Sequence, residues 1–254
     1  MTGTIKIVQH NLNKQRIASQ QLADSCKGNR ADLVLLQEPG VSQGKIVGFE
    51  SYRQVHLGNN AGAAIVIMNK DIQMLNLEQY KTDYTVAVSI RTREQAVIVV
   101  SSYFKYSLPT NVFIEQLRPI LDREVRTAGA DVNGHSTLWH SPESNERGRQ
   151  VENLVEDYLL HTVNQRGTMS TYDRPGMGSS NIDVTLITSG MIGQVTNWSV
   201  TNDTDSDHRV ISFDAVMARP CPEPGTISYR TDKADWTKMT AYLVNHVGDI
   251  IAND

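Results

Sequence analysis

The sequence predicts an α+β protein in which two mainly antiparallel β-sheets pack face to face and helices cover their outer faces. Strand-like segments recur along the chain and outnumber the helical ones. Several of them follow one another directly, which favours antiparallel pairing between neighbours. Each helical segment carries one apolar stripe, as expected of a helix lying on a sheet. A chain of 254 residues is long enough to bury the core that such a fold needs.

The expected strands are short, rich in β-branched residues, and bounded by polar or glycine-bearing segments. In chain order they are IKIVQ, DLVLLQ, GAAIVIM, YTVAVSI, QAVIVVSSY, IDVTLI, QVTNWSV and VISFDAV. YTVAVSI and QAVIVVSSY are separated by a polar turn at residues 91–94, which predicts an antiparallel hairpin.

Three apolar stripes with helical spacing lie between these strands. Their members are Ala18, Leu22 and Cys26; Phe113, Leu117 and Leu121; and Val151, Leu154, Val155, Tyr158 and Leu159. Residues 218–225 hold three of the eight prolines and predict the end of the compact domain. We therefore expect a domain over residues 1–217, and a proline-rich linker followed by an amphipathic helix over residues 218–254.

Composition excludes several functional classes. The two cysteines, Cys26 and Cys221, are too far apart in sequence to suggest a zinc site or a disulfide framework. The longest apolar runs fall far short of the roughly 20 residues that a membrane helix needs, and the N-terminus lacks a signal-peptide pattern, so we expect no membrane partner. The formal net charge of −4 neither supports nor excludes nucleic acid as a ligand.

Polar side chains gather at the ends of the predicted strands. They are Asn11, Glu38, Tyr103, Asp131 with Asn133, Asp183, and Asp207 with His208. Taken singly, most of them fit a polar turn as well as a site. Asp183 is less ordinary, because an acid within an apolar strand is rarely buried without a partner. Strand ends converge on one rim in a layered fold, so the set predicts a common cleft.

Together these residues resemble the catalytic set of the endonuclease/exonuclease/phosphatase superfamily. ADVNGHSTLWHS, NERGRQVENLV, STYDRPGMGSSNIDVTLI and SDHRVISF are similar, more narrowly, to the apurinic/apyrimidinic-type endonuclease domain of non-LTR retrotransposons. The likeness is greatest to arthropod elements that insert into ribosomal DNA or telomeric repeats. It spans about residues 5–216 and implies a four-layered αββα sandwich. The family's usual Gly-Asp-Phe-Asn reads Ala-Asp-Val-Asn at residues 130–133, which keeps both polar positions.

The resemblance implies a metal-dependent nick in DNA that leaves 3′-hydroxyl and 5′-phosphate ends. Mg²⁺, or Mn²⁺ in its place, would be held mainly by Glu38 with support from Asn11 and Asp207, since such ions prefer oxygen ligands. Asp131 would deprotonate the attacking water, which Asn133 would help to hold. His208, paired with Asp183, would donate to a phosphate oxygen, and Tyr103 would add a further phosphate contact.

The same resemblance implies double-stranded DNA and a reverse transcriptase domain of the same polyprotein as partners, and therefore a nuclear location. YRTDKADWTKM is similar to the connector that leads towards that reverse transcriptase. Candidate DNA contacts are Arg147, Arg149 and Asn202, and the segment 189–205 is a candidate minor-groove hairpin. His135 and Trp139 are interpreted as a structured loop with a packed tryptophan.

Two alternatives remain at this stage. The first is a small-molecule or lipid phosphoesterase of the same superfamily, which would share the polar set but not the NGHSTLW and NERGRQ segments. The second is a non-catalytic module that docks a larger enzyme onto DNA or chromatin, which the retention of so many catalytic-type groups disfavours.

Overall fold

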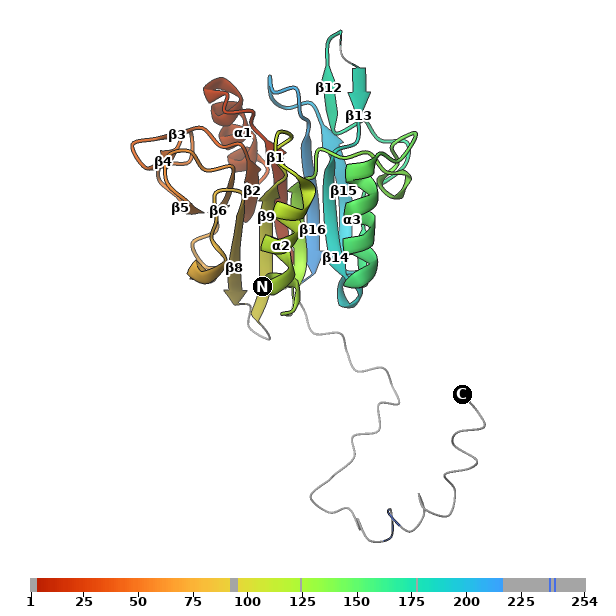
Figure 1. The fold of residues 1–254 in the computed structure, drawn as a ribbon. Coiled ribbons are helices and arrows are strands. Elements are labelled where there is room, and N and C mark those ends of the chain that lie inside the picture. Colours follow the sequence, from red (N-terminus) through yellow and green to blue (C-terminus); the bar gives the residue numbers. More distant parts are fainter. Residues whose placement is uncertain are drawn as a thin grey trace. The chain divides into compact units, whose positions relative to one another are not determined.

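The computed structural model describes residues 4–91, 96–123, 125–176, 178–216, 238 and 240. Two six-stranded sheets dominate these residues, and Figure 1 shows them lying between helices. The first sheet, in spatial order, contains β15 (Val195–Thr201), β16 (Val210–Val216), β1 (Thr4–Asn11), β2 (Leu33–Gln37), β6 (Ala63–Ile67) and β5 (Arg53–His56). The second contains β11 (Leu160–Thr162), β14 (Asp183–Thr188), β10 (Val125–Asp131), β9 (Ala96–Tyr103), β8 (Thr85–Arg91) and β7 (Gln73–Asn76).

Both sheets are mainly antiparallel, as the sequence predicts. Among the described residues, each contains one parallel pair, which is β1 with β2 in the first sheet and β9 with β10 in the second. The predicted hairpin of β8 and β9 is confirmed, with Thr85 opposite Ser102 and Arg91 opposite Ala96. Its turn, at residues 92–95, lies outside the described residues.

Helices cover the outer faces of the sheets. Helix α1 (Arg16–Gly28) joins β1 to β2 and buries Ala18, Leu22 and Cys26 against the first sheet. Helices α2 (Thr110–Leu121) and α3 (Glu146–Asp157) pack their stripes on the second sheet. The third stripe was predicted to extend too far, because α3 ends at Asp157 and Leu159 is 72% exposed. Leu159 has a left-handed φ of 49°, which turns the chain towards β11 and points the side chain outwards.

The space between the sheets is filled by apolar, largely β-branched side chains. Ile5 and Ile7 of β1 meet Val86 and Val88 of β8 and many similar residues in one continuous core. The order of layers is therefore helix, sheet, sheet, helix, and the predicted αββα sandwich is confirmed.

The remaining regular elements are short. They are the strand pairs β3 (Val41–Ser42) with β4 (Lys45–Ile46) and β12 (Tyr172–Arg174) with β13 (Gly178–Ser180), and the 3₁₀ helices η1 (Glu78–Tyr80), η2 (Thr137–Trp139) and η3 (Ser189–Met191). Trp139, in η2, is fully buried and donates from Nε1 to the carbonyl of Gly134, which confirms the packed tryptophan.

The chain divides into two units, Met1–Arg219 and Pro220–Asp254. In the second unit only Lys238 and Thr240 are described, and both are helical. The predicted linker and amphipathic helix otherwise lie outside the described residues, so the proposed domain boundary stays a prediction. Within the described residues, no helix is long and apolar enough to span a membrane.

Candidate active site

The polar residues singled out in the sequence meet at one edge of the sandwich. The first sheet supplies Asn11 at the end of β1 and Glu38 just after β2. The second sheet places Tyr103, Asp131 and Asp183 side by side, because Asp131 of β10 is in register with both of the others. A cleft of about 560 Å³ opens over them. Its walls include Asn13, Glu38, Tyr103, Tyr106, Asp131, Asn133, His135, Asn145, Tyr172, Arg174, Ser180, Ile182, Asp207 and His208.

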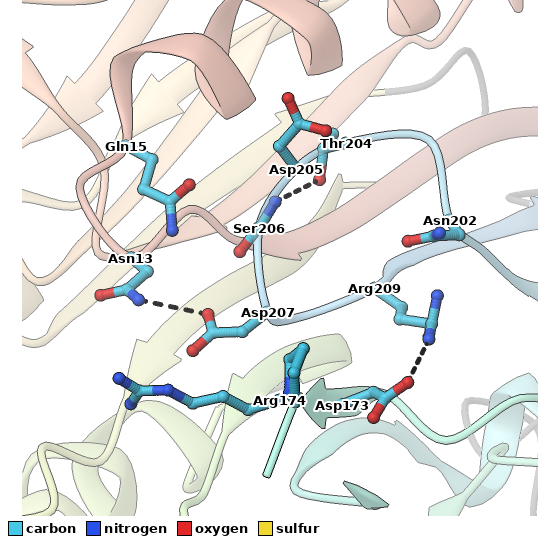
Figure 2. Close-up of a pocket in the computed structure, with 11 residues that line it drawn as sticks. Asn13, Gln15, Asp173, Arg174, Asn202, Thr204, Asp205, Ser206, Asp207 and Arg209 are labelled. Atoms are coloured by element: carbon cyan, nitrogen blue, oxygen red, sulfur yellow. Dashed lines mark hydrogen bonds and ion pairs between the residues drawn. The ribbon is translucent and has the colours of Figure 1, made fainter. Parts of the chain in front are cut away.

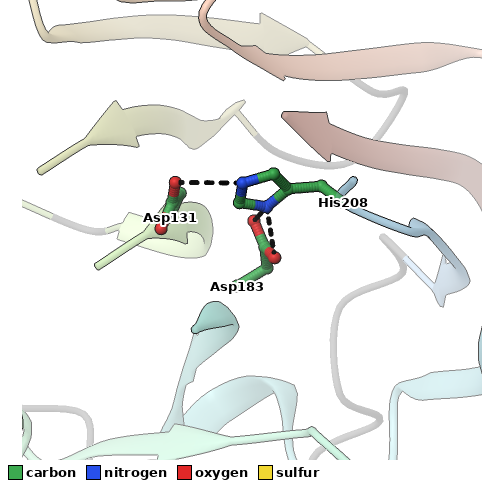
Figure 3. Close-up of side chains that lie close together, drawn as sticks. All are labelled: Asp131, Asp183 and His208. Atoms are coloured by element: carbon green, nitrogen blue, oxygen red, sulfur yellow. Dashed lines mark hydrogen bonds and ion pairs between the residues drawn. The ribbon is translucent and has the colours of Figure 1, made fainter. Parts of the chain in front are cut away.

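Asp131 and His208 line this cleft, and the buried side chain of Asp183 is hydrogen-bonded to His208 (Figure 3). His208 donates from Nδ1 to Asp183, whose carboxylate oxygens lie 2.9 and 3.1 Å away. The other ring nitrogen, Nε2, lies 4.0 Å from Oδ2 of Asp131. Tyr172 packs against the imidazole with its ring centroid at 5.0 Å. The ring is therefore held on one side by a carboxylate and faces a second carboxylate on the other.

Burial and charge shift the titration of these groups in useful directions. Burial alone lowers the pKa of His208, but the carboxylate of Asp183, its hydrogen bond and the nearby Asp131 outweigh it and raise that pKa to about 9. Burial and the neighbouring charge of Asp183 raise the pKa of Asp131 well above its ordinary value, although His208 and two hydrogen bonds act against the rise. At neutral pH the site therefore combines a protonated imidazole with a carboxyl group able to exchange a proton.

Two asparagines fix the orientation of Asp131. Asn11 donates from Nδ2 to Oδ2 of Asp131 at 2.8 Å, and the backbone N–H of Asn133 donates to Oδ1 at 2.9 Å. Asn133 also donates from its side chain to the carbonyl of Phe104 at 3.1 Å, which closes the turn after β10. Asn133 has a φ of 47°, a left-handed conformation that asparagine tolerates better than most residues.

Glu38 and Tyr103 form the wall on the other side of Asn11. Glu38 also has a left-handed φ, 45°, and its backbone N–H donates to the carbonyl of Gly62 at 2.8 Å. This conformation is unusual for glutamate and is a form of local strain that is often found at functional sites. Oε2 of Glu38 lies 3.5 Å from Nδ2 of Asn11. Burial and the nearby carboxylates of Glu38 and Asp131 raise the pKa of Tyr103, so its hydroxyl stays protonated and able to donate.

Asp207 lies where the main cleft meets a second, smaller groove (Figure 2). Its Oδ1 accepts from Nδ2 of Asn13 at 3.2 Å. The second groove, of about 440 Å³, shares Asn13, Arg174 and Asp207 with the main cleft and is otherwise polar. On its far side Arg209 pairs with Asp173 at 2.6 Å. The two grooves together form an extended polar track along the edge.

The three candidate DNA contacts occupy different surroundings. Arg147 donates to the carbonyls of Phe104, Tyr106 and Leu108 at 3.2, 3.1 and 2.6 Å, so its guanidinium braces the loop between β9 and α2. Arg149 is exposed and donates to the carbonyl of Ser144. Asn202 is exposed and lines the second groove. Their contacts with DNA stay predictions.

The segment 189–205, the candidate minor-groove hairpin, supplies the edge strand β15 of the first sheet, and its insertion into DNA stays a prediction. Most of it forms η3 and β15, and β15 is paired with β16 over residues 195–201. A separate hairpin, β12 and β13, belongs to neither large sheet and projects beyond them at the top of Figure 1. Sequence reasoning missed this hairpin and two cleft residues near it, Tyr172 and Arg174. The run of turn residues in DRPGMGSS was the available signal.

The donor set fits a divalent cation. Glu38 and Asp207 line the cleft and offer carboxylate oxygens, the hard ligands that Mg²⁺ prefers. The amide oxygen of Asn11 accepts from the backbone N–H of Asn13 at 2.8 Å, and its amide nitrogen faces Glu38 and Asp131. Asp131, Asp183 and His208 also lie close enough to one another to share an ion. The proton that His208 retains argues against it as a ligand, because metal binding needs a neutral imidazole.

Comparisons with known proteins agree with this architecture. The model of the family described as endonuclease-reverse transcriptase matches residues 97–212. A retrovirus-related Pol polyprotein from type-1 retrotransposable element R1 of Bradysia coprophila is 31% identical over 192 residues. That match covers 68% of this chain but 19% of the relative, so the chain spans about a fifth of the relative's length.

Solved structures give the same picture. The endonuclease domain of TRAS1, a telomere-specific non-LTR retrotransposon, is 29% identical, has a TM-score of 0.76, and the match covers 84% of this chain and 98% of that one. AP endonuclease LMAP from Leishmania major is 11% identical with a TM-score of 0.67, over 85% of this chain and 88% of that one. The second likeness shows the fold alone.

Proposed function

Because this chain belongs to the endonuclease/exonuclease/phosphatase superfamily, among the endonuclease domains of non-LTR retrotransposons, we propose that it nicks double-stranded DNA by hydrolysing one phosphodiester bond. The observation that carries the proposal is the group formed by Asp131, Asp183 and His208, of which Asp131 and His208 line one cleft. The nick would leave a 3′-hydroxyl and a 5′-phosphate. That 3′ end would prime reverse transcription by a polymerase domain of the same polyprotein, and the work would take place in the nucleus.

Asp131 is suited to activate the attacking water. Its pKa is raised towards neutral pH, and a general base is most effective when its pKa lies near the operating pH. It takes one proton from the water as the water oxygen forms a bond to phosphorus. The bond from phosphorus to the 3′ oxygen then breaks, and that oxygen takes a proton from solvent. Asn11 and Asn133 keep the carboxylate in one orientation during this step.

His208 is suited to stabilise the charge that builds on the phosphate. Its Nδ1–H is fixed by Asp183, so Nε2–H points away from that bond and towards the cleft. A protonated imidazole in a buried site stabilises a developing negative charge more strongly than it would in water. Tyr103, which keeps its proton, supplies a second donor.

A divalent cation, Mg²⁺ or Mn²⁺, would be held by the carboxylates of Glu38 and Asp207. Asn11 would join them only through its amide oxygen, which accepts from the backbone N–H of Asn13. When bound, such an ion neutralises phosphate charge and polarises the bond to phosphorus. Glu38 is held rigidly by its backbone bond to Gly62, which keeps its carboxylate at the mouth of the cleft.

The surroundings of the cleft suit a polymeric anion better than a small phosphate ester. Tyr106 is 78% exposed beside the cleft, and Arg147 fixes the backbone below it. Arg174, on the β12–β13 hairpin, lines both grooves. An exposed aromatic ring and a cation along an extended track are features that bind sugar, base and phosphate together.

The test is to incubate the purified chain with supercoiled plasmid, with Mg²⁺ or with EDTA, beside Asp131→Asn and His208→Gln. We expect Mg²⁺-dependent conversion to open circles that both variants lose, while the surface variant Asp24→Asn keeps it. End-labelling of the nicks should show 3′-hydroxyl and 5′-phosphate termini. Nicking by Asp131→Asn and His208→Gln at the wild-type rate would overturn the proposal. Hydrolysis of sphingomyelin or inositol phosphates by a wild type that does not nick DNA would also overturn it.

A further inference from the structure

A layer of buried polar side chains lies directly beneath the candidate active site, between the two sheets. Successive residues of a strand point to opposite faces, so Ile5, Ile7, Gln9 and Asn11 of β1 share the face towards the second sheet. The first two belong to the apolar core, and the last is a site residue. Gln9 lies on this face between the apolar core residue Ile7 and the site residue Asn11, and it is fully buried.

The second sheet repeats this pattern on the facing side. Each of its site residues has a polar side chain or a glycine two positions away, on the same face of the strand and one step nearer the core. The pairs are Tyr103 with Ser101, Asp131 with Gly129, and Asp183 with Thr185. Strand register aligns the lower members, since Gly129 lies opposite both Thr185 and Ser101.

Gln9 reaches across this layer from one sheet to the other. Its Nε2 donates to the carbonyl of Ala130 at 3.4 Å and to that of Val184 at 3.3 Å. Its Oε1 accepts from Oγ1 of Thr185 at 3.0 Å. Ala130 and Val184 are the chain neighbours of Asp131 and Asp183, so a single side chain of the first sheet holds the backbone beside both catalytic aspartates.

Gly129 makes room for this contact. A Cβ at this position would lie 2.8 Å from Oε1 of Gln9 and 2.8 Å from Cδ1 of Leu35. A glycine inside a buried strand otherwise weakens it, and it often marks a place where another group approaches closely. Gln9 and Gly129 are therefore complementary parts of one contact.

The site needs such a contact because it is divided between the sheets. Asn11, on the first sheet, must reach Oδ2 of Asp131, on the second, at 2.8 Å. The apolar core below attracts the sheets without fixing their direction, since hydrophobic burial is not directional. Hydrogen bonds to backbone carbonyls are directional, and they fix both the separation and the register of the two strands.

We infer that Gln9 is a positioning residue: its bonds to the carbonyls of Ala130 and Val184 set the two sheets so that Asn11 meets Asp131. This inference rests on the proposed nicking activity for its kinetic readout, and on the hydrogen bond of Asn11 for a second readout that needs no activity.

The test compares Gln9→Met, which keeps the length of the side chain and removes its amide, with Ile7→Val. The control removes a methyl group two residues below on the same face and loosens the same core without touching a hydrogen bond. For each variant, kcat and KM for plasmid nicking are measured at a temperature where unfolding curves show the protein fully folded. The side-chain amide signals of Asn11 are followed by NMR in the same samples.

For Gln9→Met we expect kcat to fall roughly ten- to a hundred-fold, as expected of a small misplacement of catalytic groups, with KM within about two-fold of wild type. The Asn11 amide should move towards the position and exchange rate of a free amide. Ile7→Val should change neither quantity. If Gln9→Met matches Ile7→Val in both readouts, Gln9 is only a satisfied core residue and the inference is wrong.

Gly129→Ala is the second variant, and it decides the question if Gln9→Met fails to fold. It leaves every polar group in place but pushes on Oε1 of Gln9 and on Cδ1 of Leu35. We expect the same loss of kcat and the same change in the Asn11 amide. An unchanged amide and unchanged kcat in Gly129→Ala would contradict the inference. If wild type nicks no DNA, the proposed function fails, and the Asn11 amide alone then decides whether Gln9 positions it.

Discussion

His10 and His208 are buried at the same edge of the sandwich, yet the imidazole of His10 is neutral and that of His208 is positively charged at neutral pH. Burial, reinforced by the nearby His208, lowers the pKa of His10 to about 3, so this imidazole is neutral. Burial acts on His208 in the same direction, but Asp183 and its neighbours raise that pKa to about 9. His10 shares its Nε2 hydrogen bond with the hydroxyl of Thr204 at 2.9 Å, whereas His208 faces a carboxylate.

The hydrogen-bond partner, and not the depth of burial, therefore sets the charge of these two buried histidines. A hydroxyl satisfies a neutral ring, while a carboxylate stabilises a proton on it. His10 thereby holds the loop that carries Asp207 and His208, because Thr204 lies in that loop and the hydroxyl of Ser206 donates to the carbonyl of Asn11. One histidine holds the loop, and the other is the proposed donor to the phosphate.

The largest expected effect comes from removing the difference. Asp183→Asn gives His208 a neutral partner like that of His10, so its pKa should fall below the ordinary 6.5 of histidine. The ring would then lose its proton at neutral pH, and we expect kcat to drop by roughly 10²- to 10⁴-fold. NMR titration of the His208 ring and nicking kinetics check the two parts. A His208 pKa that stays near 9 in this variant would contradict our account of the pair.

A smaller effect should appear in stability at alkaline pH. The pKa of His208 is raised on folding, so its contribution to the free energy of unfolding is complete below about pH 6.5 and is lost as the pH rises through about 9. We expect the unfolding temperature of wild type to fall between about pH 6.5 and about pH 9 by more than that of His208→Gln, because these two pKa values bound the loss. Parallel curves for the two proteins would show that the proton on His208 adds no stability.

His10 should show the opposite dependence. Its pKa is lowered on folding to about 3, so the unfolded chain binds a proton below about pH 6.5 that the folded chain does not. Stability is therefore lost as the pH falls from about 6.5, at up to about 1.4 kcal/mol per pH unit for this one group. His10→Gln should remove that part of the acid slope in urea unfolding at pH 6, 5 and 4. An identical slope in the variant would mean that His10 takes up its proton in the folded state.

The smallest effect concerns the hydroxyl partner of His10. Thr204→Val keeps the shape of the side chain but leaves Nε2 of a buried ring without its bond, which should cost about 1–3 kcal/mol of unfolding free energy. Thr204→Ser keeps the hydroxyl and should recover most of that loss. Urea unfolding at pH 7.5 measures both. Equal stability of the valine and serine variants would show that the bond contributes nothing.

The sequence alone predicts much of this site for a physical reason. Alternating apolar segments show where strands end, and strand ends in a layered fold meet at one edge, so Asn11, Glu38 and Asp131 could be placed together. Asp183 was recognisable because a buried acid needs a partner, and His208 is that partner. These arguments use only local pattern and general chemistry.

What could not be predicted depends on distances across the fold. Nothing local distinguishes His10 from His208, since Thr204 and Asp183 reach them only through tertiary contacts. Gln9 looks like one more strand residue until the second sheet lies opposite it. Arg147 has the positive charge expected of a DNA contact, but the carbonyls to which it donates lie about forty residues earlier in the chain.

The pairing of β1 with β16 has a consequence for the order in which the protein becomes active. Thr4 lies opposite Val216, so the first and last strands of the described domain are neighbours in the first sheet. Closing so long a loop is entropically costly and comes late in folding. During synthesis the chain already carries Asn11, Glu38, Asp131 and Asp183, but it lacks the strand that anchors His208 beside them. A nascent or truncated chain therefore lacks the cationic group of the proposed site, and we expect nicking only after the two ends of the domain have met.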